Sequence, residues 1–175
     1  MAFAVPSHNI EPLELGPGMK VVDLGAGSGF YAILAGRRVG QTGKIYAIDL
    51  TASHLSRIRS EARKEKLHNI ETVVADLDHE KLGLSDSSMD AAIISNILFL
   101  LSDREHCLTE LGRVLKPRSL VLLIDWKESF GGVWPPKNKV ITPGKAIALF
   151  SQKGFRALKE FDAGEHHYGL IFQKI

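Results

Sequence analysis

Hydrophobic and polar positions alternate along this chain in two ways, which predict two kinds of element. Short apolar runs bounded by Gly, Pro, Asp or Asn predict strands that are covered on both faces, as in a parallel sheet. Longer stretches with apolar residues three and four positions apart predict helices. The predicted strands are residues 20–24, 44–48, 71–75, 91–95, 120–125, 155–161 and 167–174, and the predicted helices are residues 29–39, about 52–67, 103–116 and 143–153.

The order of these elements predicts an α/β fold. Strands and helices alternate up to about residue 153, as expected for a mostly parallel sheet. The last two strands are joined by residues 162–165, a connection short enough for an antiparallel hairpin. Residues 1–18 contain three prolines and little periodicity, so we expect an N-terminal arm or short lid, followed by one domain over residues 19–175.

A glycine-rich turn follows the first predicted strand. The run Val-Val-Asp-Leu-Gly-Ala-Gly-Ser-Gly-Phe places Asp23 before Gly25, Gly27 and Gly29, and a helical pattern begins directly afterwards. Glycine permits left-handed backbone and the close approach of a ligand, and a helix N-terminus offers free N–H groups. The dinucleotide fingerprint G-x-G-x-x-G would need its third glycine one residue later, at Phe30. The spacing therefore disfavours a nicotinamide cofactor, and no P-loop lysine follows.

The turn resembles motif I, D/E-x-G-x-G-x-G, of the class I S-adenosylmethionine (SAM) methyltransferases. Further segments match the family in the same order, namely residues 46–49 (Tyr-Ala-Ile-Asp), 73–76 (Val-Val-Ala-Asp), 90–96 and 111–117. The resemblance covers roughly residues 19–126. Arg118 and Ser119 stand where many members have two glycines. The resemblance implies a three-layer α-β-α sandwich with a seven-stranded sheet in the order 3-2-1-4-5-7-6, in which the last strand is antiparallel.

The resemblance also implies a cofactor site at the carboxyl ends of the strands, where α/β sheets bind ligands. Asp49 would accept hydrogen bonds from the ribose hydroxyls; the alternative is an acid that favours a helix N-terminus. Asp76 would take the adenine amino group, with Leu77 on the adenine face; the alternative is a polar loop. Asp23 and Asn96 would lie near the methionine part. The predicted cofactor-binding residues are Asp23, Gly25, Ala26, Gly27, Gly29, Asp49, Leu50, Asp76, Leu77 and Asn96.

Composition and charge agree with one water-soluble domain. The chain has 175 residues, a net charge of +2 and a charged fraction of 24%, which gives no overall bias toward nucleic acid or membranes. The single cysteine, Cys107, excludes an internal disulfide, predicts a buried or half-buried thiol and disfavours arsenic methylation, which relies on several cysteines. No signal peptide is recognisable, and the longest apolar run, residues 91–101, is far shorter than a membrane helix. We therefore expect a cytoplasmic protein.

Several other residues are weaker candidates. The histidines show no metal-ligand spacing, so no metal is expected, and a surface or loop role is predicted for His166 and His167. The basic residues around Arg57–Lys66 predict a solvated helix face rather than an RNA-binding patch. Trp126 or Trp134 would form a wall of the acceptor pocket, although Trp126 could equally cap the core. The possible catalytic bases are Asp125, Glu128 and His8, and nothing in their spacing selects one.

Three functions remain open from the sequence. The first is a SAM-dependent methyltransferase that acts on a small molecule, with S-adenosylhomocysteine (SAH) as the second product. The second is an RNA or protein methyltransferase, although Asn96 is not followed by the Pro-Pro-Tyr/Phe signature of amino-methylating enzymes. The third is a SAM-binding or SAH-binding module without transferase activity. The acceptor and the oligomeric state are not readable, and a homodimer remains possible.

Overall fold

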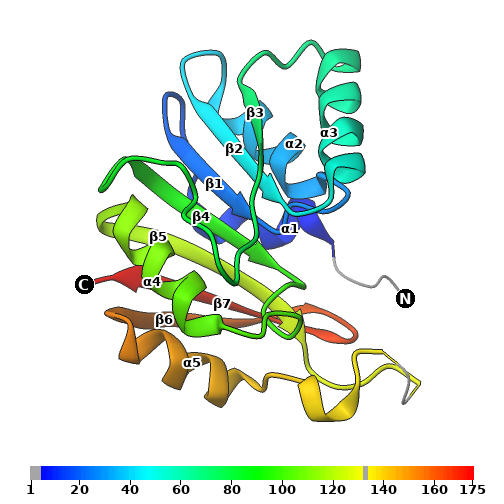
Figure 1. The fold of residues 1–175 in the computed structure, drawn as a ribbon, viewed down its shortest axis with the longest axis vertical. Coiled ribbons are helices and arrows are strands. Elements are labelled where there is room, and N and C mark those ends of the chain that lie inside the picture. Colours follow the sequence, from blue (N-terminus) through cyan, green and yellow to red (C-terminus); the bar gives the residue numbers. More distant parts are fainter. Residues whose placement is uncertain (1–4, 132–133) are drawn as a thin grey trace.

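The computed structural model describes residues 5–131 and 134–175. Within them, the strands form one sheet in the order β3-β2-β1-β4-β5-β7-β6 (Figure 1). The strand pairs from β3 through to β5 are parallel, and β7 is antiparallel to both β5 and β6. This confirms the predicted topology. The strands are β1 Lys20–Leu24, β2 Lys44–Asp49, β3 Ile70–Val74, β4 Met89–Ser95, β5 Leu115–Trp126, β6 Phe155–Gly164 and β7 His167–Lys174.

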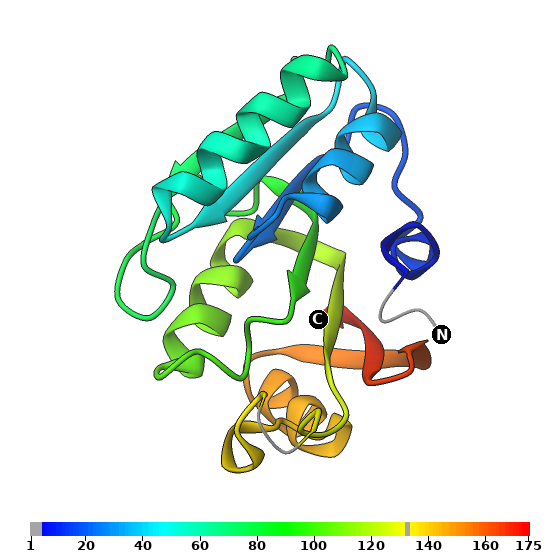
Figure 2. The same ribbon diagram turned by 90° about the vertical axis from the view of Figure 1, so that its right-hand side faces the viewer.

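Helices cover both faces of the sheet, as Figure 2 shows from the side. One face carries α1 (Pro6–Asn9), the 3-10 turn η1 (Glu11–Leu13), α2 (Phe30–Val39) and α3 (Ala52–Lys64). The other face carries α4 (Arg104–Val114) and α5 (Pro143–Gln152), and a short 3-10 turn, η2 (Lys137–Lys139), precedes α5. The three-layer α-β-α sandwich predicted from the sequence is therefore confirmed. No helix within the described residues is long and apolar enough to cross a membrane.

Burial on both faces explains why the strands are continuous apolar runs. Successive side chains of a strand point to opposite faces of the sheet. Val21 packs into the core beneath α2 and α3, whereas Val22 packs into the core beneath α4 and α5, and both are fully buried. Burial of a side chain of this size stabilises the fold by about 1.5–3 kcal/mol. The two helix layers therefore depend on the same central strands.

Two predicted element boundaries are wrong. Strand β5 begins at Leu115, directly after α4, and not at residue 120. Its pairing with β4 is irregular between Met89 and Ala91, and Arg118 adopts a left-handed φ of 66°. Because of this irregularity, the sequence of residues 117–119 predicts a turn instead of a strand. At the other end of the chain, β6 continues to Gly164 through a second irregularity. The hairpin connection is therefore shorter than predicted.

The N-terminal segment, predicted as an arm or short lid, is anchored to the sheet where it is described. Ile10 and Leu13 are buried in the core beneath α2. The side-chain amide of Asn9 donates a hydrogen bond of 2.9 Å to the carbonyl of Ala163 in β6. Residues 1–4 of the predicted arm lie outside the described residues. The segment therefore contributes core contacts as well as reaching the carboxyl edge of the sheet.

The turn before α2 should tolerate a side chain less well than an equally left-handed glycine elsewhere. Gly29 and Gly154 have φ values of 82° and 81°. A Cβ atom at Gly29 would lie 2.5 Å from Cγ1 of the buried Ile58, whereas one at Gly154 would meet nothing within 4 Å. Both alanine variants carry strain of roughly 1–2 kcal/mol. In urea unfolding, Gly29→Ala should lose about 1–3 kcal/mol more than Gly154→Ala because of overpacking. Equal losses would show that Ile58 moves aside freely.

Candidate active site

The glycine turn between β1 and α2 is left-handed at each of its three glycines. The φ values of Gly25, Gly27 and Gly29 are 67°, 50° and 82°. A Cβ atom at Gly25 would come within 2.6 Å of the Ile97 side chain, so this glycine lets the loop after β4 pack closely. A Cβ atom at Gly27 would meet only the Gly25 carbonyl oxygen, at 3.8 Å. The backbone at Gly27 is therefore open on one side, as a ligand-binding turn requires.

The carboxylate of Asp49, at the end of β2, holds this turn in place. Its Oδ2 accepts a hydrogen bond of 2.8 Å from the Gly27 amide, and its Oδ1 accepts one of 2.8 Å from the Thr51 amide. His54 Nδ1 lies 3.2 Å from the same Oδ1. The Ala26 amide also donates to the Ile48 carbonyl at 2.9 Å. The end of β2, the turn and the start of α3 are thus tied into one unit.

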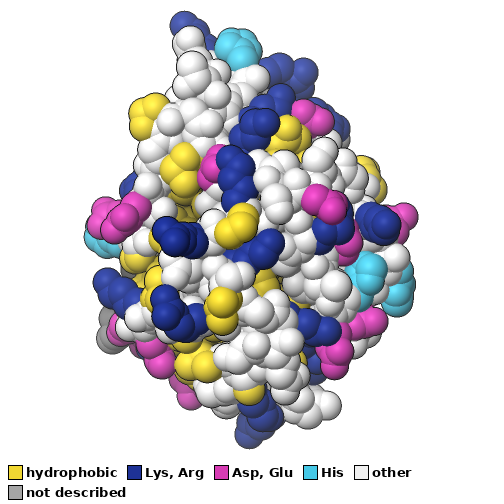
Figure 3. All heavy atoms as spheres, turned by 90° about the vertical axis from the view of Figure 1, so that its left-hand side faces the viewer, with side chains coloured by type: hydrophobic (Ala, Val, Ile, Leu, Met, Phe, Trp, Pro, Cys, Tyr) yellow, Lys and Arg dark blue, Asp and Glu magenta, His cyan; other side chains and the backbone are white. Residues whose placement is uncertain are grey.

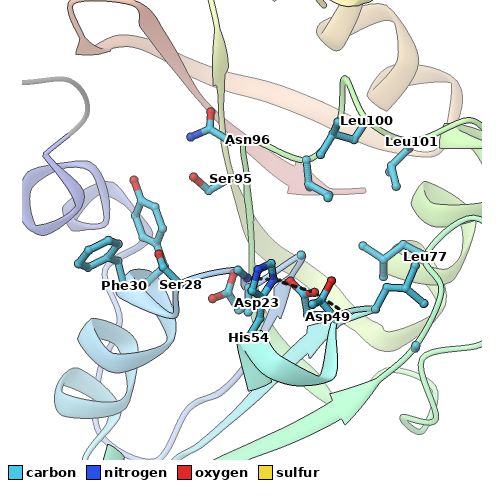
Figure 4. Close-up of a pocket in the computed structure, with 18 of the residues that line it drawn as sticks. Asp23, Ser28, Phe30, Asp49, His54, Leu77, Ser95, Asn96, Leu100 and Leu101 are labelled. Atoms are coloured by element: carbon cyan, nitrogen blue, oxygen red, sulfur yellow. Dashed lines mark hydrogen bonds and ion pairs between the residues drawn. The ribbon is translucent and has the colours of Figure 1, made fainter. Parts of the chain in front are cut away.

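A cavity of about 840 Å³ opens at the carboxyl ends of β1, β2 and β4 (Figure 4). This volume lies toward the upper end of ligand pockets, about 300–1,000 Å³. Three exposed apolar side chains line it, Phe30, Leu50 and Leu100. Of the predicted cofactor residues, the cavity brings together Asp23, Gly25, Ala26, Gly27, Asp49, Leu50, Asp76, Leu77 and Asn96. Gly29 is not among the lining residues; it is the N-cap of α2 and lets that helix pack against Ile58 in α3.

Asp23 is a buried carboxyl group on the cavity wall. Only 2% of the residue is exposed, and its Oδ2 has no hydrogen-bond partner. Burial raises the pKa of Asp23 to about 8, and the nearby negative charge of Asp49 acts in the same direction. A backbone amide at Ala32 opposes the shift only in part. The group therefore keeps its proton at neutral pH until a cation or a hydrogen-bond donor approaches.

Asn96 lies across the cavity from Asp23, directly after β4 (Figure 4). It adopts a left-handed φ of 56°, which asparagine tolerates better than most residues. Its side-chain oxygen is buried and has no partner. Buried polar atoms are normally hydrogen-bonded, so the unpaired oxygens of Asp23 and Asn96 indicate a polar ligand between them.

Comparisons with known proteins agree with this geometry. A family model described as a methyltransferase domain matches residues 15–148. The chain belongs to the class I SAM-dependent methyltransferase family. The cofactor of this family is SAM, and the product is SAH. The unpaired oxygens and the open glycine turn fit such a cofactor, which carries both hydroxyl groups and an amino group.

The relatives found include proteins of different length. The chain is 34% identical over 124 residues to the ubiquinone/menaquinone biosynthesis C-methyltransferase UbiE of Laribacter hongkongensis. This match covers 71% of this chain and 48% of that protein. It is 30% identical over 111 residues to an arsenite methyltransferase of Halobacterium salinarum, which covers 63% of this chain and 28% of that protein. This methyltransferase domain thus spans about half the length of these relatives, or less.

A solved structure covers the whole fold. The chain matches a SAM-dependent methyltransferase from Aquifex aeolicus with a TM-score of 0.89 and 27% identity, over 99% of this chain and 91% of that one. The shared architecture therefore includes the N-terminal segment and the last hairpin as well as the glycine turn.

One residue on the cavity wall, His167, was not predicted there from the sequence. The prediction of a surface or loop role is wrong for His167, which is 2% exposed and lines the cavity. Its ring lies 4.2 Å from that of Trp126, which also lines the cavity, while Trp134 does not. The burial of His167 depends on a contact between distant parts of the sequence, since β7 pairs with β5 and places His167 opposite Trp126.

The three candidate bases are not brought into the cavity. Asp125 is fully buried and does not line it, and burial raises its pKa to about 7. Glu128 and His8 are exposed and also lie outside the lining. No group of three potential metal ligands occurs among the described residues. Cys107 is buried, as predicted, and burial raises its pKa to about 12.

The protonation of Asp23 should make stability depend on pH. A carboxyl group whose pKa is raised by folding stabilises the fold fully below about pH 4 and loses this contribution as pH rises through about 8. Asp23→Asn removes the titration, so its stability relative to wild type should increase between pH 5 and 8.5, by at most about 1.4 kcal/mol per pH unit. Urea unfolding at the two pH values measures this.

The exposed Asp162 in β6 provides the matched control. Its pKa is lowered by the Lys127 ammonium, so it is ionised throughout this pH range. The stability difference between Asp162→Asn and wild type should therefore be the same at pH 5 and 8.5. A pH-independent difference for Asp23→Asn as well would show that the Asp23 carboxyl is not held in its protonated form.

Proposed function

We propose that this chain is a SAM-dependent methyltransferase that methylates a small-molecule acceptor. The observation that carries the proposal is the left-handed glycine turn, open at Gly27 and held by the Asp49 carboxylate at the mouth of a large cavity. When bound, SAM supplies a methyl group activated by its sulfonium centre. The residues of the chain bind and orient the two ligands.

The acidic residues divide the cofactor between them in this proposal. Asp49 accepts from the ribose hydroxyls, because each carboxylate oxygen can accept more than one hydrogen bond. Asp76 follows β3 and takes the adenine amino group, while Leu50 and Leu77 pack against the adenine ring. Leu50 supports this placement, since its side chain lines the cavity but is 63% exposed without a ligand.

The other end of the cofactor lies against the buried oxygens. Asp23 and Asn96 meet the methionine part, and the amino group of that part compensates the unpaired Oδ2 of Asp23. A cation beside Asp23 favours the ionised carboxyl, so binding near neutral pH is accompanied by proton release from this group. Acceleration then comes mainly from alignment of the acceptor with the methyl group in a site that restricts its motion.

Several observations favour a small-molecule acceptor. Apolar side chains of Ile97, Leu100 and Leu101 line the cavity, whose volume of about 840 Å³ lies toward the upper end for ligand pockets. The name of the Laribacter relative refers to ubiquinone and menaquinone biosynthesis. An arsenite acceptor, named for the Halobacterium relative, fits less well, because the only thiol of this chain is buried and strongly disfavours its thiolate form.

The surface charges favour a nucleic-acid or protein acceptor less than a small molecule. On α3, Arg59 and Lys64 are exposed, as predicted for a solvated face, and Lys64 pairs with Glu61. Figure 3 shows the side of the molecule on the left of Figure 1, where Lys and Arg side chains are interspersed with acidic and apolar ones. Lys44–Glu71 is one of the ion pairs between neighbouring strands. A binding module without transferase activity remains the alternative that a turnover assay excludes.

Cofactor identity is testable by thermal unfolding. SAM and SAH should each raise the melting temperature, because a ligand that binds only the folded state stabilises it by about 2.7 kcal/mol at a hundredfold excess over Kd. NADH serves as the control nucleotide and should have little effect. A larger shift with NADH than with SAH would contradict the proposed function.

Removal of the Asp49 carboxylate should weaken SAM and SAH equally. Both ligands carry the ribose, so Asp49→Ala is expected to raise both Kd values about tenfold or more, as loss of a charge-assisted hydrogen bond does. Isothermal titration calorimetry gives the two values. Asp162→Ala, which removes an exposed carboxylate of β6, should leave both unchanged. If Asp49→Ala keeps wild-type affinity, the ribose lies elsewhere and the assignment of the cofactor residues is wrong.

A further inference from the structure

The far wall of the cavity carries an aromatic pair that the proposed cofactor contacts do not use. Trp126 ends β5 and His167 begins β7, and the two residues are direct partners in the antiparallel pairing. Their ring centroids are 4.2 Å apart at an interplanar angle of 41°. Both residues line the cavity. The pair is therefore a fixed part of the sheet edge and not a loop feature.

The polar atoms of this pair are buried and unsatisfied. Neither ring nitrogen of His167 has a hydrogen-bond partner, and the indole nitrogen of Trp126 has none. Native structures rarely leave such atoms unpaired, because each loses its hydration without compensation. Three unpaired nitrogens on adjoining side chains in one cavity wall indicate that a ligand, and not the protein, completes their hydrogen bonds.

The chemistry of these nitrogens limits what the ligand is. Burial lowers the pKa of His167 to about 4, and the charges of His166 and Lys127 act in the same direction, so the imidazole is uncharged at neutral pH. It offers one N–H donor and one bare nitrogen acceptor, and Trp126 offers a second donor. A hydroxyl group can accept from a donor and donate to the bare nitrogen. An ammonium ion finds no carboxylate in this pair.

The sheet order places this wall next to the proposed cofactor site and not within it. Asp49 ends β2 and Asp76 follows β3, on one side of β1. Trp126 and His167 lie on β5 and β7, on the other side of β4. Asn96 directly follows β4, which lies between the two sets of strands in the sheet. Leu100 and Leu101, which come after β4 in the chain, add apolar surface to the same cavity. A ligand here has an apolar body and a polar end.

We propose that Trp126 and His167 form the acceptor subsite, in which the His167 imidazole hydrogen bonds a hydroxyl group of an uncharged, largely apolar acceptor. This proposal rests on the proposed methyltransferase function and names the class of its second substrate. His167 then makes the site prefer acceptors with a hydroxyl group over amines and over molecules without a hydrogen-bond donor.

The test uses three planar probes of similar size, with the protein saturated with SAH. They are 1-naphthol, its methyl ether, which lacks the donor, and 1-naphthylmethylammonium, which carries a charge. Calorimetry should show that wild type binds 1-naphthol at least about tenfold more tightly than either analogue, as sites built around a hydroxyl do. Equal affinities, tighter binding of the ammonium probe, or no binding of 1-naphthol at millimolar concentration would overturn the proposal.

Variants separate recognition from a structural role. His167→Phe should reduce the preference for 1-naphthol to less than about twofold, while His167→Gln, which keeps a donor and an acceptor, should restore part of it. Because His167→Phe replaces unpaired buried nitrogens by apolar atoms, its melting temperature should be unchanged or higher. A lower melting temperature with an unchanged preference would show that the ring is only structural and would overturn the proposal.

The neighbouring histidine is the matched control. His166 does not line the cavity, so His166→Phe should keep the preference for 1-naphthol. SAH affinity should stay within about twofold of wild type in every variant, because neither His166 nor His167 is among the residues proposed to bind the cofactor. If SAH itself fails to bind wild type, the proposed function fails; if SAH binds and the probes are not distinguished, only the hydroxyl subsite fails.

Discussion

The hydrogen bond between the Gly27 amide and the Asp49 carboxylate is the constraint on which the site depends. It joins the turn after β1 to the end of β2 at 2.8 Å and keeps the open side of the turn toward the cavity. Gly27 adopts its left-handed backbone at φ 50° without the strain that a side chain would add. Because the same carboxylate accepts from the Thr51 amide, α3 is aligned with the turn as well. The cavity mouth is thus shaped by one charged group held at a strand end.

The fold and the residues that line the cavity near β1 and β2 were predictable because their signals are local. Val22 is buried whichever face of the sheet it points to, because helices cover both faces. Asp49 stands directly at a strand end. The position of each residue in its apolar run therefore places it. His167 was misplaced because its burial depends on pairing with Trp126, more than forty positions away in the chain. The start of β5 was predicted too late for a related reason. Arg118 has a left-handed conformation at the irregular pairing between β5 and β4, which the sequence does not show. Neither effect is visible in residue order.

The cavity has two electrostatic characters. Near β1 and β2, burial and the nearby negative charge of Asp49 raise the pKa of Asp23 and keep its carboxyl protonated in the free protein. Near β5 and β7, Trp126 and His167 present uncharged nitrogens. A cationic cofactor end therefore gains most beside the carboxyl groups, and an uncharged molecule gains most at the aromatic pair. In the proposed function, this separation orients the cofactor and the acceptor on opposite sides of β4.

The most direct test of this account is a crystal structure of the protein with SAH. The account predicts density for SAH in the cavity, with the ribose hydroxyls within hydrogen-bond distance of Asp49 and the homocysteine amino group near Asp23 and Asn96. The far wall at Trp126 and His167 should stay clear of the cofactor. Density for the ligand at another surface, or a homocysteine part that fills the space beside His167, would contradict the central claim that the glycine turn and Asp49 position the cofactor.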